Sequence, residues 1–353
     1  MRIYVPLASG LSAQRWAERH CRGEVPDMSP YGLHKLGRFG DEIEFGTNEF
    51  DRVTRIVAAS LRRTTGGLEL AEDVVRRARY GRRNDTDVVL AYDERTGLPA
   101  LLLPAHPRVP VATGIGWLTT RARTPWLQAR LAARSLPAAA AVWAQSRPVL
   151  PIIGREWSVG TSRLHYIPLG IDAEFYTEQD EPDEPGVIVS AGEDRYRDHD
   201  LLIEAVRRVR GNHRATLRLA TSIKVVLPPE LGILYTGRLD GRIRNWYRQA
   251  SVVAIALHPT VTGSGLTVAL EAMASRRAVV MTDNPGVSDY VRHGITGLLV
   301  PPGDPAAFAR AIDELLTDDD RRAAMGAAAA AAVRTHFTTD HMAESLAKML
   351  NSI

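Results

Sequence analysis

Short apolar runs alternate with segments of helical period along the whole chain of 353 residues. Continuous apolar runs without strict alternation are typical of parallel strands that are buried on both faces. The pattern therefore predicts repeated strand–helix units, an α/β fold with open parallel sheets and right-handed crossovers. The predicted strands read RIYVPL, DVVLAY, PVATGIG, AAVWAQS and LHYIPLG in the first half, and GVIVSAG, ATLRLAT, GILYTG, SVVAIALH, AVVMTD and TGLLVPP in the second.

Helical periodicity predicts the elements between these strands. The alanine-rich segment 326–333 also favours a helix, because alanine has the highest helix propensity. The region 20–70 and its surroundings are less legible, with helix patterns at 50–62 and 69–79. The other predicted helices cover 124–136, 198–210, 240–250, 265–275 and 304–316.

The length favours two domains rather than one core. An acidic, proline-bearing and apolar-poor segment at 173–186 predicts a linker. We expect one Rossmann-like domain at 1–172, a second at 187–335, and a helix within 336–353 that packs back on the first. Two doubly wound parallel sheets of this kind would face a central cleft at the carboxyl ends of their strands.

Composition narrows the class of protein. The apolar fraction of 45% excludes a largely disordered chain, and the net charge of +3 is weak evidence for nucleic acid as a partner. Three of the 44 basic residues are lysines, which suggests a GC-rich bacterial genome. The lone Cys21 cannot form an internal disulfide, and no cysteine–histidine cluster has zinc spacing. We expect a cytoplasmic protein without a transmembrane segment, which leaves peripheral membrane contact open.

The segment TGSGLTVALEAM carries the first candidate chemistry. Gly263 and Gly265 come between a strand and an apolar helix that contains Thr267 in its first turn. Amide groups at a helix start favour an anion such as a diphosphate, and glycines let it approach the backbone. Glu271 could accept hydrogen bonds from hydroxyls of the same ligand. A tight structural turn with Glu271 on a solvated face is the alternative.

The segment SAGEDRYRDHD is the second candidate. A strand ends at Gly192, and Asp198 or Asp200 is suited to cap the following helix. Arg195 and Arg197 lie in the connecting loop, where two guanidinium groups suit a phosphate or diphosphate. A solvated loop is the alternative. Asp304, followed by Pro305, is placed to start a later helix.

Glycines near the ends of other predicted strands are weaker evidence for a ligand-binding site. Gly10 follows the first strand but does not complete a dinucleotide fingerprint, which argues against an ordinary dehydrogenase. Gly116 and Trp117 stand at the end of the strand PVATGIG and could line a cleft or only turn the chain. The sequence has no nucleophile elbow, P-loop or HExxH motif.

The order of motifs over residues 164–316 resembles the carboxyl-terminal domain of retaining nucleotide-sugar glycosyltransferases, the family called "glycosyl transferases group 1", which has the GT-B fold. The motifs are HYIPLGIDAEFY, VIVSAGEDRYRDHDLLIEA, LYTGRLDGRIRNWYRQASVVAIALHPT and GSGLTVALEAMASRRAVVMTDNPGVSDYVRHGITGLLVPPGD. The amino-terminal half is compatible with the same fold through its strand–helix alternation.

The resemblance implies a role for each matching position. Glu271 closes the family's Glu–seven residues–Glu motif and would bind the nucleotide ribose. The family's arginine and lysine fall near Arg195 and on Arg197, which would stabilise the leaving diphosphate, so the catalytic set is Arg195, Arg197 and Glu271. The implied donor-binding residues are Gly10, Gly192, Arg238, Leu239, Gly263, Ser264, Gly265, Leu266, Thr267 and Glu271.

Three departures from the family pattern bear on specificity. Gly263, or Thr262 if one residue is inserted, replaces the opening acid of the motif, which normally contacts the transferred sugar. Arg197 replaces a lysine and keeps the charge without its compact geometry. Gly116 or Trp117 stands where the family often has a histidine.

The implied reaction moves a sugar from a nucleoside-diphosphate sugar to an acceptor hydroxyl or amine with retention of configuration. The acceptor is expected to be a small-molecule natural product or an envelope glycan precursor bound by the first domain. We expect no metal and no cofactor beyond the donor substrate. A nucleotide-sugar epimerase or phosphorylase of the same fold, or an inactive nucleotide-sugar-binding protein, are the alternatives.

Overall fold

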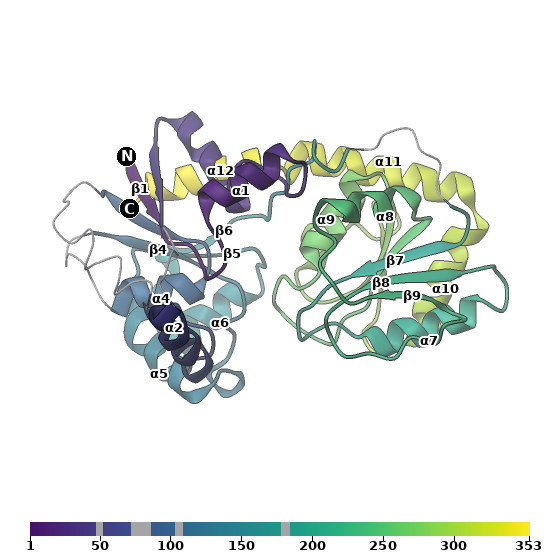
Figure 1. The fold of residues 1–353 in the computed structure, drawn as a ribbon, viewed down its shortest axis with the longest axis horizontal. Helices are drawn as coiled ribbons and strands as arrows, with labels where there is room; N and C mark the ends of the chain where they lie inside the picture. Colours follow the sequence, from purple (N-terminus) through teal and green to yellow (C-terminus); the bar gives the residue numbers. More distant parts are fainter. Residues whose placement is uncertain (47–51, 72–85, 103–108, 178–183) are drawn as a thin grey trace. The chain divides into compact units, whose positions relative to one another are not determined.

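A computed structural model describes residues 1–46, 52–71, 86–102, 109–177 and 184–353 (Figure 1). The chain forms two compact units, which are described separately below. Unit 1 comprises Met1–Arg22, Asp27–Pro168 and Asp340–Ile353, and unit 2 comprises Gly23–Pro26 and Leu169–Thr339. The described parts of the segment predicted as a linker belong to unit 2, and its residues 178–183 lie outside the described ranges.

Unit 1 contains a six-stranded parallel sheet in the order β2-β1-β3-β4-β5-β6. Five of these strands match the runs predicted in the first half of the sequence. The edge strand β2 was missed, because its sequence EIEF is short and half polar. The strands are β1 (Arg2–Val5), β2 (Glu42–Phe45), β3 (Val88–Ala91), β4 (Val111–Ile115), β5 (Ala141–Ala144) and β6 (Leu164–Tyr166).

Unit 2 contains a second six-stranded parallel sheet, in the order β12-β11-β10-β7-β8-β9. All six strands predicted in the second half are present. They are β7 (Val187–Ala191), β8 (Thr216–Ala220), β9 (Gly232–Tyr235), β10 (Val252–Ile255), β11 (Ala278–Thr282) and β12 (Leu298–Val300).

Helices alternate with these strands and cover the sheets (Figure 1). Asp198 and Asp304 cap two of them, each accepting a backbone N–H three residues on, as the sequence predicted. Helices α1, α4 and α6 were not predicted, and the helix predicted at 69–79 lies largely outside the described residues. The helices are α1 (Ala13–Cys21), α2 (Arg52–Thr65), α4 (Glu94–Leu102), α5 (Trp126–Ser135), α6 (Val149–Trp157), α7 (His199–Val209), α8 (Ile243–Gln249), α9 (Leu266–Ala274), α10 (Pro305–Thr317), α11 (Asp319–His336) and α12 (Thr339–Leu350).

The strands of unit 2 are buried on both faces, which explains their continuous apolar runs. In β10, Val253 and Ile255 pack with α9 and α11, whereas Val252 and Ala254 pack with α7 and α10. Successive side chains of a strand point to opposite faces, so one run of four apolar residues supplies both cores. Unit 2 is therefore doubly wound.

The core of unit 1 includes the carboxyl-terminal helix. Met342, Leu346 and Leu350 of α12 are buried together with Val5 and Leu90 of the sheet. The chain thus returns to unit 1 after completing unit 2, and α12 covers one face of the first sheet. In the described part of the chain, no helix is both long enough and apolar enough to span a bilayer.

Gly326 lets α11 closely approach the backbone of Arg276, which belongs to the same unit. A Cβ atom at this position would lie 2.2 Å from the carbonyl oxygen of Arg276. That separation is far below van der Waals contact, and the obstructing atom belongs to backbone, which yields little. The glycine is therefore needed for packing inside a long helix that would otherwise favour alanine.

We predict that Gly326→Ala lowers the melting temperature of the protein. Helix propensity alone would stabilise the variant by about 1 kcal/mol. Steric overlap with Arg276 reverses the sign, with a net destabilisation of about 1–3 kcal/mol. Differential scanning calorimetry of parent and variant measures the effect, and an unchanged or higher melting temperature would contradict the packing argument.

Candidate functional site

The strand order of unit 2 reverses between β7 and β10. The chain runs from β7 outward to β8 on one side and from β10 outward to β11 on the other. Doubly wound sheets bind ligands at such a switch point, outside the carboxyl ends of the strands. The loops that follow β7 and β10 carry the two segments selected from the sequence, 192–198 and 256–265.

Asp194 joins these two loops. One carboxylate oxygen accepts hydrogen bonds from the Ser264 hydroxyl at 2.7 Å and from the Tyr196 amide at 3.0 Å. The other accepts from Nε of Arg197 at 2.9 Å. Backbone bonds add to the connection, since the amide of His258 donates to the carbonyl of Tyr196 at 2.8 Å. The loop after β7 is thus fixed to the turn before α9.

Arg197 is 9% exposed, and its guanidinium lies against Gly192. A Cβ atom at Gly192 would be 2.1 Å from Nε of Arg197, so a larger residue there would displace the side chain. Burial lowers the pKa of Arg197, although the Asp194 carboxylate opposes that shift. Nη1 of Arg197 is buried and has no hydrogen-bond partner. Such an orphaned donor is costly unless a ligand satisfies it.

Helix α9 begins through a left-handed residue without a side-chain cap. Gly265 has φ +80°, and a Cβ atom there would lie 2.9 Å from both Ile255 and Met281. The first turn has no acidic residue. Thr267 is exposed, and the amide of Leu266 makes only a long bond of 3.3 Å to the carbonyl of Gly263. The helix start therefore retains the positive end of its dipole for an anion.

Thr262 and Gly263 are the two positions that could take the place of the acid that opens the family motif, and their surroundings differ. Thr262 is buried, and its hydroxyl is 2.9 Å from the hydroxyl of Thr260. Asn284 supports this turn by accepting the amide of Thr260 and donating to the carbonyl of His258. Gly263 is half-buried and presents no side chain. No acidic side chain therefore comes from this turn.

Glu271 lies between two tyrosines and not on a solvated face of α9. The hydroxyl of Tyr176 donates to one of its carboxylate oxygens at 2.7 Å, and the hydroxyl of Tyr247 donates to the other at 2.8 Å. Burial raises the pKa of Glu271, while both hydrogen bonds and nearby Arg197 oppose the shift. Burial also raises the pKa of both tyrosines well above their ordinary value. A carboxylate has about four acceptor sites, so it can receive further hydroxyl donors.

We predict that Glu271→Gln changes how stability depends on pH. In the parent, ionisation of Glu271 costs more in the folded state because the pKa is raised from its ordinary value of 4.5. The parent's free energy of unfolding should therefore fall, relative to the variant, as pH rises from about 4 through the raised folded-state pKa. Urea unfolding of both proteins over this range measures the difference.

A matched control for this titration is Glu230→Gln, since Glu230 is exposed. As a surface substitution, it should change the free energy of unfolding by no more than about 0.5 kcal/mol. A pH-independent offset between Glu271→Gln and the parent would show that the raised pKa is wrong.

Three other predicted donor residues of unit 2 form no side-chain hydrogen bond or ion pair with Asp194 among the described contacts. Arg195 is exposed, with its guanidinium 5.0 Å from the ring centre of Tyr196. Arg238 is also exposed, and its Nε is 3.7 Å from Asp240. Leu239 is buried. The structure thus brings together Gly192, Arg197, the turn at 263–265 and Glu271, while the roles of Arg195, Arg238 and Leu239 stay predictions.

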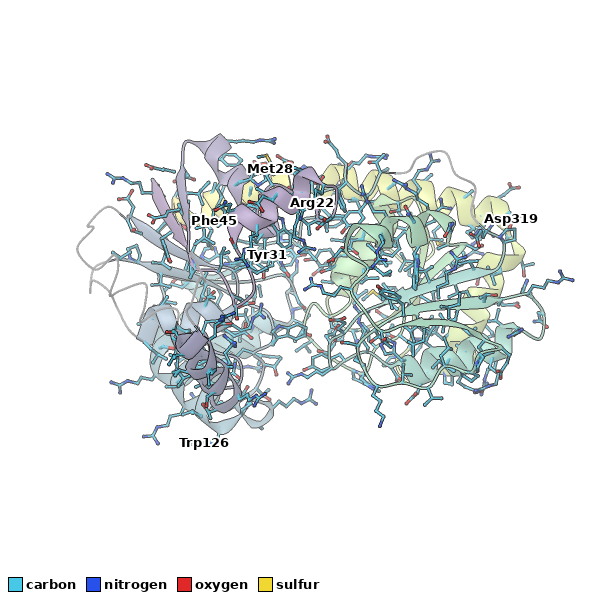
Figure 2. The ribbon with its side chains drawn as sticks, viewed as in Figure 1. Arg22, Met28, Tyr31, Phe45, Trp126 and Asp319 are labelled. Atoms are coloured by element: carbon cyan, nitrogen blue, oxygen red, sulfur yellow. The ribbon has the colours of Figure 1, made fainter. Side chains whose placement is uncertain are left out.

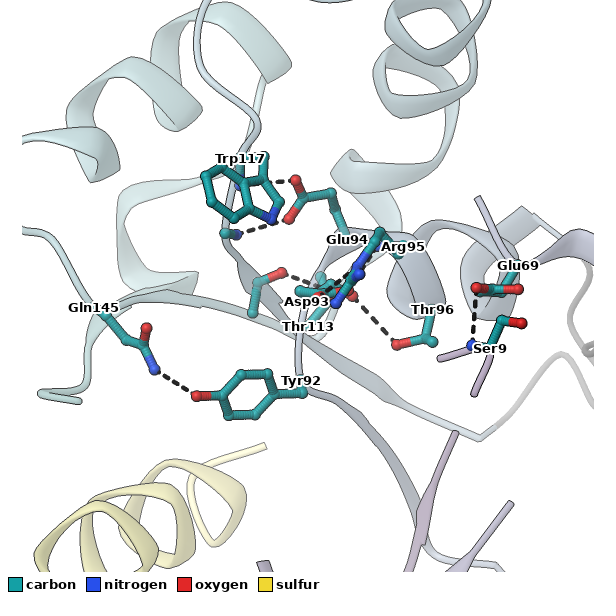
Figure 3. Close-up of polar contacts among 12 residues, drawn as sticks. Ser9, Glu69, Tyr92, Asp93, Glu94, Arg95, Thr96, Thr113, Trp117 and Gln145 are labelled. Atoms are coloured by element: carbon teal, nitrogen blue, oxygen red, sulfur yellow. Dashed lines mark hydrogen bonds and ion pairs between the residues drawn. The ribbon is translucent and has the colours of Figure 1, made fainter. Parts of the chain in front are cut away.

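A second polar cluster lies at the carboxyl ends of the strands in unit 1 (Figure 3). Glu94 at the start of α4 is fully buried and accepts the amides of Gly116 at 2.7 Å and Trp117 at 2.8 Å. Burial raises the pKa of Glu94, and the neighbouring charge of Asp93 raises it further. Arg95 forms an ion pair with Asp93 at 2.5 Å. Glu94 thereby fixes the turn after β4.

Aromatic residues adjoin this cluster. The rings of Tyr31 and Tyr92 stack with centroids 3.5 Å apart, and the hydroxyl of Tyr92 accepts from Gln145 at 2.8 Å. Burial raises the pKa of Tyr31 to about 12. Gly10 is an exposed left-handed residue in the turn after β1, and the adjacent Ser9 donates its amide to Glu69 at 2.9 Å. Trp117 is 38% exposed.

Sequence reasoning missed Glu94, Tyr92, Tyr176 and Tyr247. A usable signal existed for Glu94, because the run YDER directly follows a buried strand. The tyrosines gave none, since their partners come from distant positions in the chain. Within the described ranges, no group of three or more His, Cys, Asp and Glu side chains is arranged to hold a metal ion.

We predict that Glu94→Gln destabilises unit 1. An amide side chain offers one oxygen, so its NH₂ group would face one of the two backbone amides that Glu94 now accepts. One buried N–H would lose its partner, at a cost of about 1–3 kcal/mol. Urea unfolding monitored by circular dichroism measures the loss, and an unchanged midpoint would exclude this role for the carboxylate.

Two parallel-sheet units, with a buried cation and an uncapped helix start at the switch point of one of them, define an α/β protein with a candidate site for an anion. Residues 185–318 match the family model described as "Glycosyl transferases group 1". The resemblance to the group 1 glycosyl transferases that the sequence indicated is therefore confirmed over this part of unit 2.

Two curated relatives match over about a third of the chain or less. A D-inositol 3-phosphate glycosyltransferase from Thermobispora bispora is 34% identical over 102 residues, which are 28% of this chain and 23% of that protein. The lipopolysaccharide core biosynthesis mannosyltransferase LpcC from Rhizobium leguminosarum is 34% identical over 121 residues, 34% of this chain and 33% of that protein. The matches thus span a third or less of these relatives.

Solved structures match over the whole chain. Anabaena Alr3699/HepE, crystallised with UDP and glucose, superposes with a TM-score of 0.69 at 16% identity and covers 100% of both chains. The sucrose-phosphate synthase of Thermosynechococcus elongatus gives a TM-score of 0.74 at 15% identity, covering 100% of this chain and 98% of that one. The chain therefore has the two-unit GT-B fold that the resemblance predicted.

Proposed function

We propose that this protein is a glycosyltransferase that moves a sugar from a nucleoside-diphosphate sugar to an acceptor hydroxyl or amine. The observation that carries the proposal is the buried guanidinium of Arg197, whose Nη1 has no partner. It lies at the switch point of unit 2, connected through Asp194 and Ser264 to the uncapped start of α9. A diphosphate would satisfy this cation and the helix-start amides together.

The proposed chemistry follows from these positions. The bond between the anomeric carbon and the diphosphate breaks while a bond to the acceptor oxygen or nitrogen forms. Arg197 and the amides at the start of α9 stabilise the negative charge that develops on the leaving diphosphate. The leaving phosphate accepts the acceptor's proton, and configuration at the anomeric carbon is retained. The positioning of donor and acceptor supplies much of the remaining rate enhancement over the uncatalysed reaction.

Glu271 is the proposed ligand of the ribose hydroxyls. Its two tyrosine partners fix the carboxylate and leave acceptor capacity for further O–H donors. The family acid over the transferred sugar is replaced by Gly263, so sugar selection rests on other groups. Unit 1 is the proposed acceptor side, with a small-molecule natural product or an envelope glycan precursor as acceptor. We propose the cytoplasm as its compartment, consistent with the exposed free thiol of Cys21.

Calorimetric titration with nucleoside diphosphates tests the proposal. We expect binding of at least one of them, and Arg197→Gln should weaken it by about ten- to a hundredfold, the value of a lost charge-assisted hydrogen bond. Arg207→Gln is the matched control, because Arg207 is an exposed arginine of α7 paired with Glu204. Failure of every nucleoside diphosphate to bind would overturn the donor site.

A turnover screen then separates the reaction classes. Nucleotide sugars are incubated with and without acceptors, and NMR follows the anomeric configuration of the product. Transfer with retention supports the proposal. Donor turnover that needs no acceptor, or needs phosphate, indicates the epimerase or phosphorylase class, and binding without turnover indicates an inactive binding protein. A Glu271→Ala variant that binds as well as the parent would refute the ribose role.

A further inference from the structure

Four residues from near the amino terminus belong to unit 2. The segment Gly23–Pro26 follows α1 and Arg22, which are part of unit 1, and the chain returns to unit 1 at Asp27. Arg22, which directly precedes the segment, is labelled in Figure 2. Val25 is only 5% exposed, so the segment is packed against other residues. Unit 2, which holds the candidate site, thus includes a piece of chain that is distant in the sequence.

A glycine brings this segment close to the residues before α8. A Cβ atom at Gly241 would lie 2.2 Å from the carbonyl oxygen of Gly23 and 3.1 Å from Cα of Glu24. The first separation leaves no room for a side chain, because the obstructing atom belongs to backbone. The carbonyl of Gly23 is thereby held beside the start of α8.

Arg244 of α8 joins this segment to two other stretches of the chain. Its Nη2 donates to the carbonyl of Gly23 at 2.9 Å, and its Nε donates to the carbonyl of Gly241 at 3.0 Å. Its Nη1 donates to the carbonyl of Phe175 at 3.4 Å, and the guanidinium lies 4.0 Å from the centre of the Phe175 ring. One planar group therefore contacts three separate stretches at fixed angles.

The hydrogen bonds of Arg244 go to carbonyls, and among the described residues it forms no ion pair with a carboxylate. Burial lowers the pKa of Arg244, and the charge of Arg248 lowers it further, while Tyr176 opposes the shift. Nη1 of Arg197 has no partner, whereas every nitrogen of Arg244 has one. Arg244 is therefore placed to organise unit 2 and not to bind an anion.

One of the joined stretches carries a hydrogen-bond donor of Glu271. Phe175 is followed by Tyr176, whose hydroxyl donates to the Glu271 carboxylate at 2.7 Å. The other donor, Tyr247, lies three residues after Arg244 on α8, so these two side chains are neighbours on the helix surface. Both donors to the carboxylate thus come from stretches that Arg244 holds together.

Loss of Arg244 would loosen the stretch that carries Tyr176 without exposing it. The carbonyl of Tyr176 would still accept the hydroxyl of Ser275, which is 3.0 Å away. The hydroxyl of Tyr176 would be held less firmly against Glu271, and the carboxylate would sample more orientations. Binding groups lose affinity when the residues that support them no longer fix their geometry.

We propose that Arg244 is a positioning residue for the Glu271 carboxylate and that the segment Gly23–Pro26 is its anchor. The inference rests on the proposed role of Glu271 as the ligand of the ribose hydroxyls. Arg244 fixes the stretch that carries Tyr176, and the two tyrosines set the orientation of the carboxylate. Affinity for ribose therefore depends on a side chain that does not touch the nucleotide and on a segment from near the amino terminus.

Calorimetric titration with ligands that differ in their ribose hydroxyls tests the proposal. UDP, GDP, ADP and CDP are screened, and each one that binds is compared with its 2′,3′-dideoxy form and with inorganic diphosphate. Arg244→Met keeps the apolar stem and removes the donors. It should weaken binding of the nucleoside diphosphate about tenfold, the value of about one hydrogen bond. The dideoxy form and inorganic diphosphate should bind as to the parent, because Arg197 and the start of α9 are unchanged.

Two further variants separate geometry from charge and test the anchor. Arg244→Lys keeps the charge without the planar fork, so it should weaken nucleoside diphosphate binding to the same extent. Gly241→Ala would displace the carbonyl of Gly23 and should weaken this binding as well, again without affecting inorganic diphosphate. The matched controls are Arg207→Gln, at an exposed arginine of α7, and Gly211→Ala, where the nearest atom to a Cβ would be 3.4 Å away. Both should bind every ligand like the parent.

A double-mutant cycle of Arg244→Met and Tyr176→Phe tests the link without a ligand. If Arg244 positions Tyr176, the changes that the two substitutions cause in urea unfolding should not add. Additive changes would overturn the proposal, as would parent-like binding of nucleoside diphosphates by Arg244→Met or an equal loss for inorganic diphosphate. If no nucleoside diphosphate binds the parent, the proposed donor site fails, and the cycle still decides whether Arg244 positions Tyr176.

Discussion

The carboxylate of Asp194 holds the site of unit 2 together. It bonds Arg197 of its own loop and Ser264 of the loop before α9, at the point where the strand order reverses. A buried ion pair adds little net stability once desolvation is counted, so its effect here is mainly geometrical. Asp194 engages Nε of the guanidinium and leaves Nη1 unsatisfied in a fixed position. The anion binding proposed for this site depends on that arrangement.

The position of the Glu271 carboxylate is also fixed by hydrogen bonds. Tyr176 and Tyr247 each supply one hydroxyl to the carboxylate, so its position is set before any ligand is present. The site therefore contains a fixed cation and a fixed carboxylate, for which we propose phosphate and hydroxyl groups as ligands. Gly263 leaves the place of the second family acid without a side chain. The part of the motif suited to a nucleotide is retained, and the part suited to the sugar has changed.

In unit 1, a buried carboxylate also fixes the position of a loop. Glu94 accepts two consecutive backbone amides and so fixes the turn that carries Trp117 at the carboxyl end of β4. In both units a carboxylate that is largely removed from water orders a loop at the edge where parallel α/β sheets bind ligands.

The sequence determined the strand–helix alternation, the doubly wound sheet of unit 2 and the loops of its site, because burial of parallel strands and helix capping leave local patterns. Asp198 is one example, since its capping bond reaches only three residues. The tertiary structure decided the surroundings of those side chains whose partners are distant in the sequence. It separated the exposed Arg195 from the buried Arg197, placed Glu271 between two tyrosines, and gave Glu94 its two amides. Hydrogen bonds between residues far apart in the chain leave no periodicity, so only the folded arrangement reveals them.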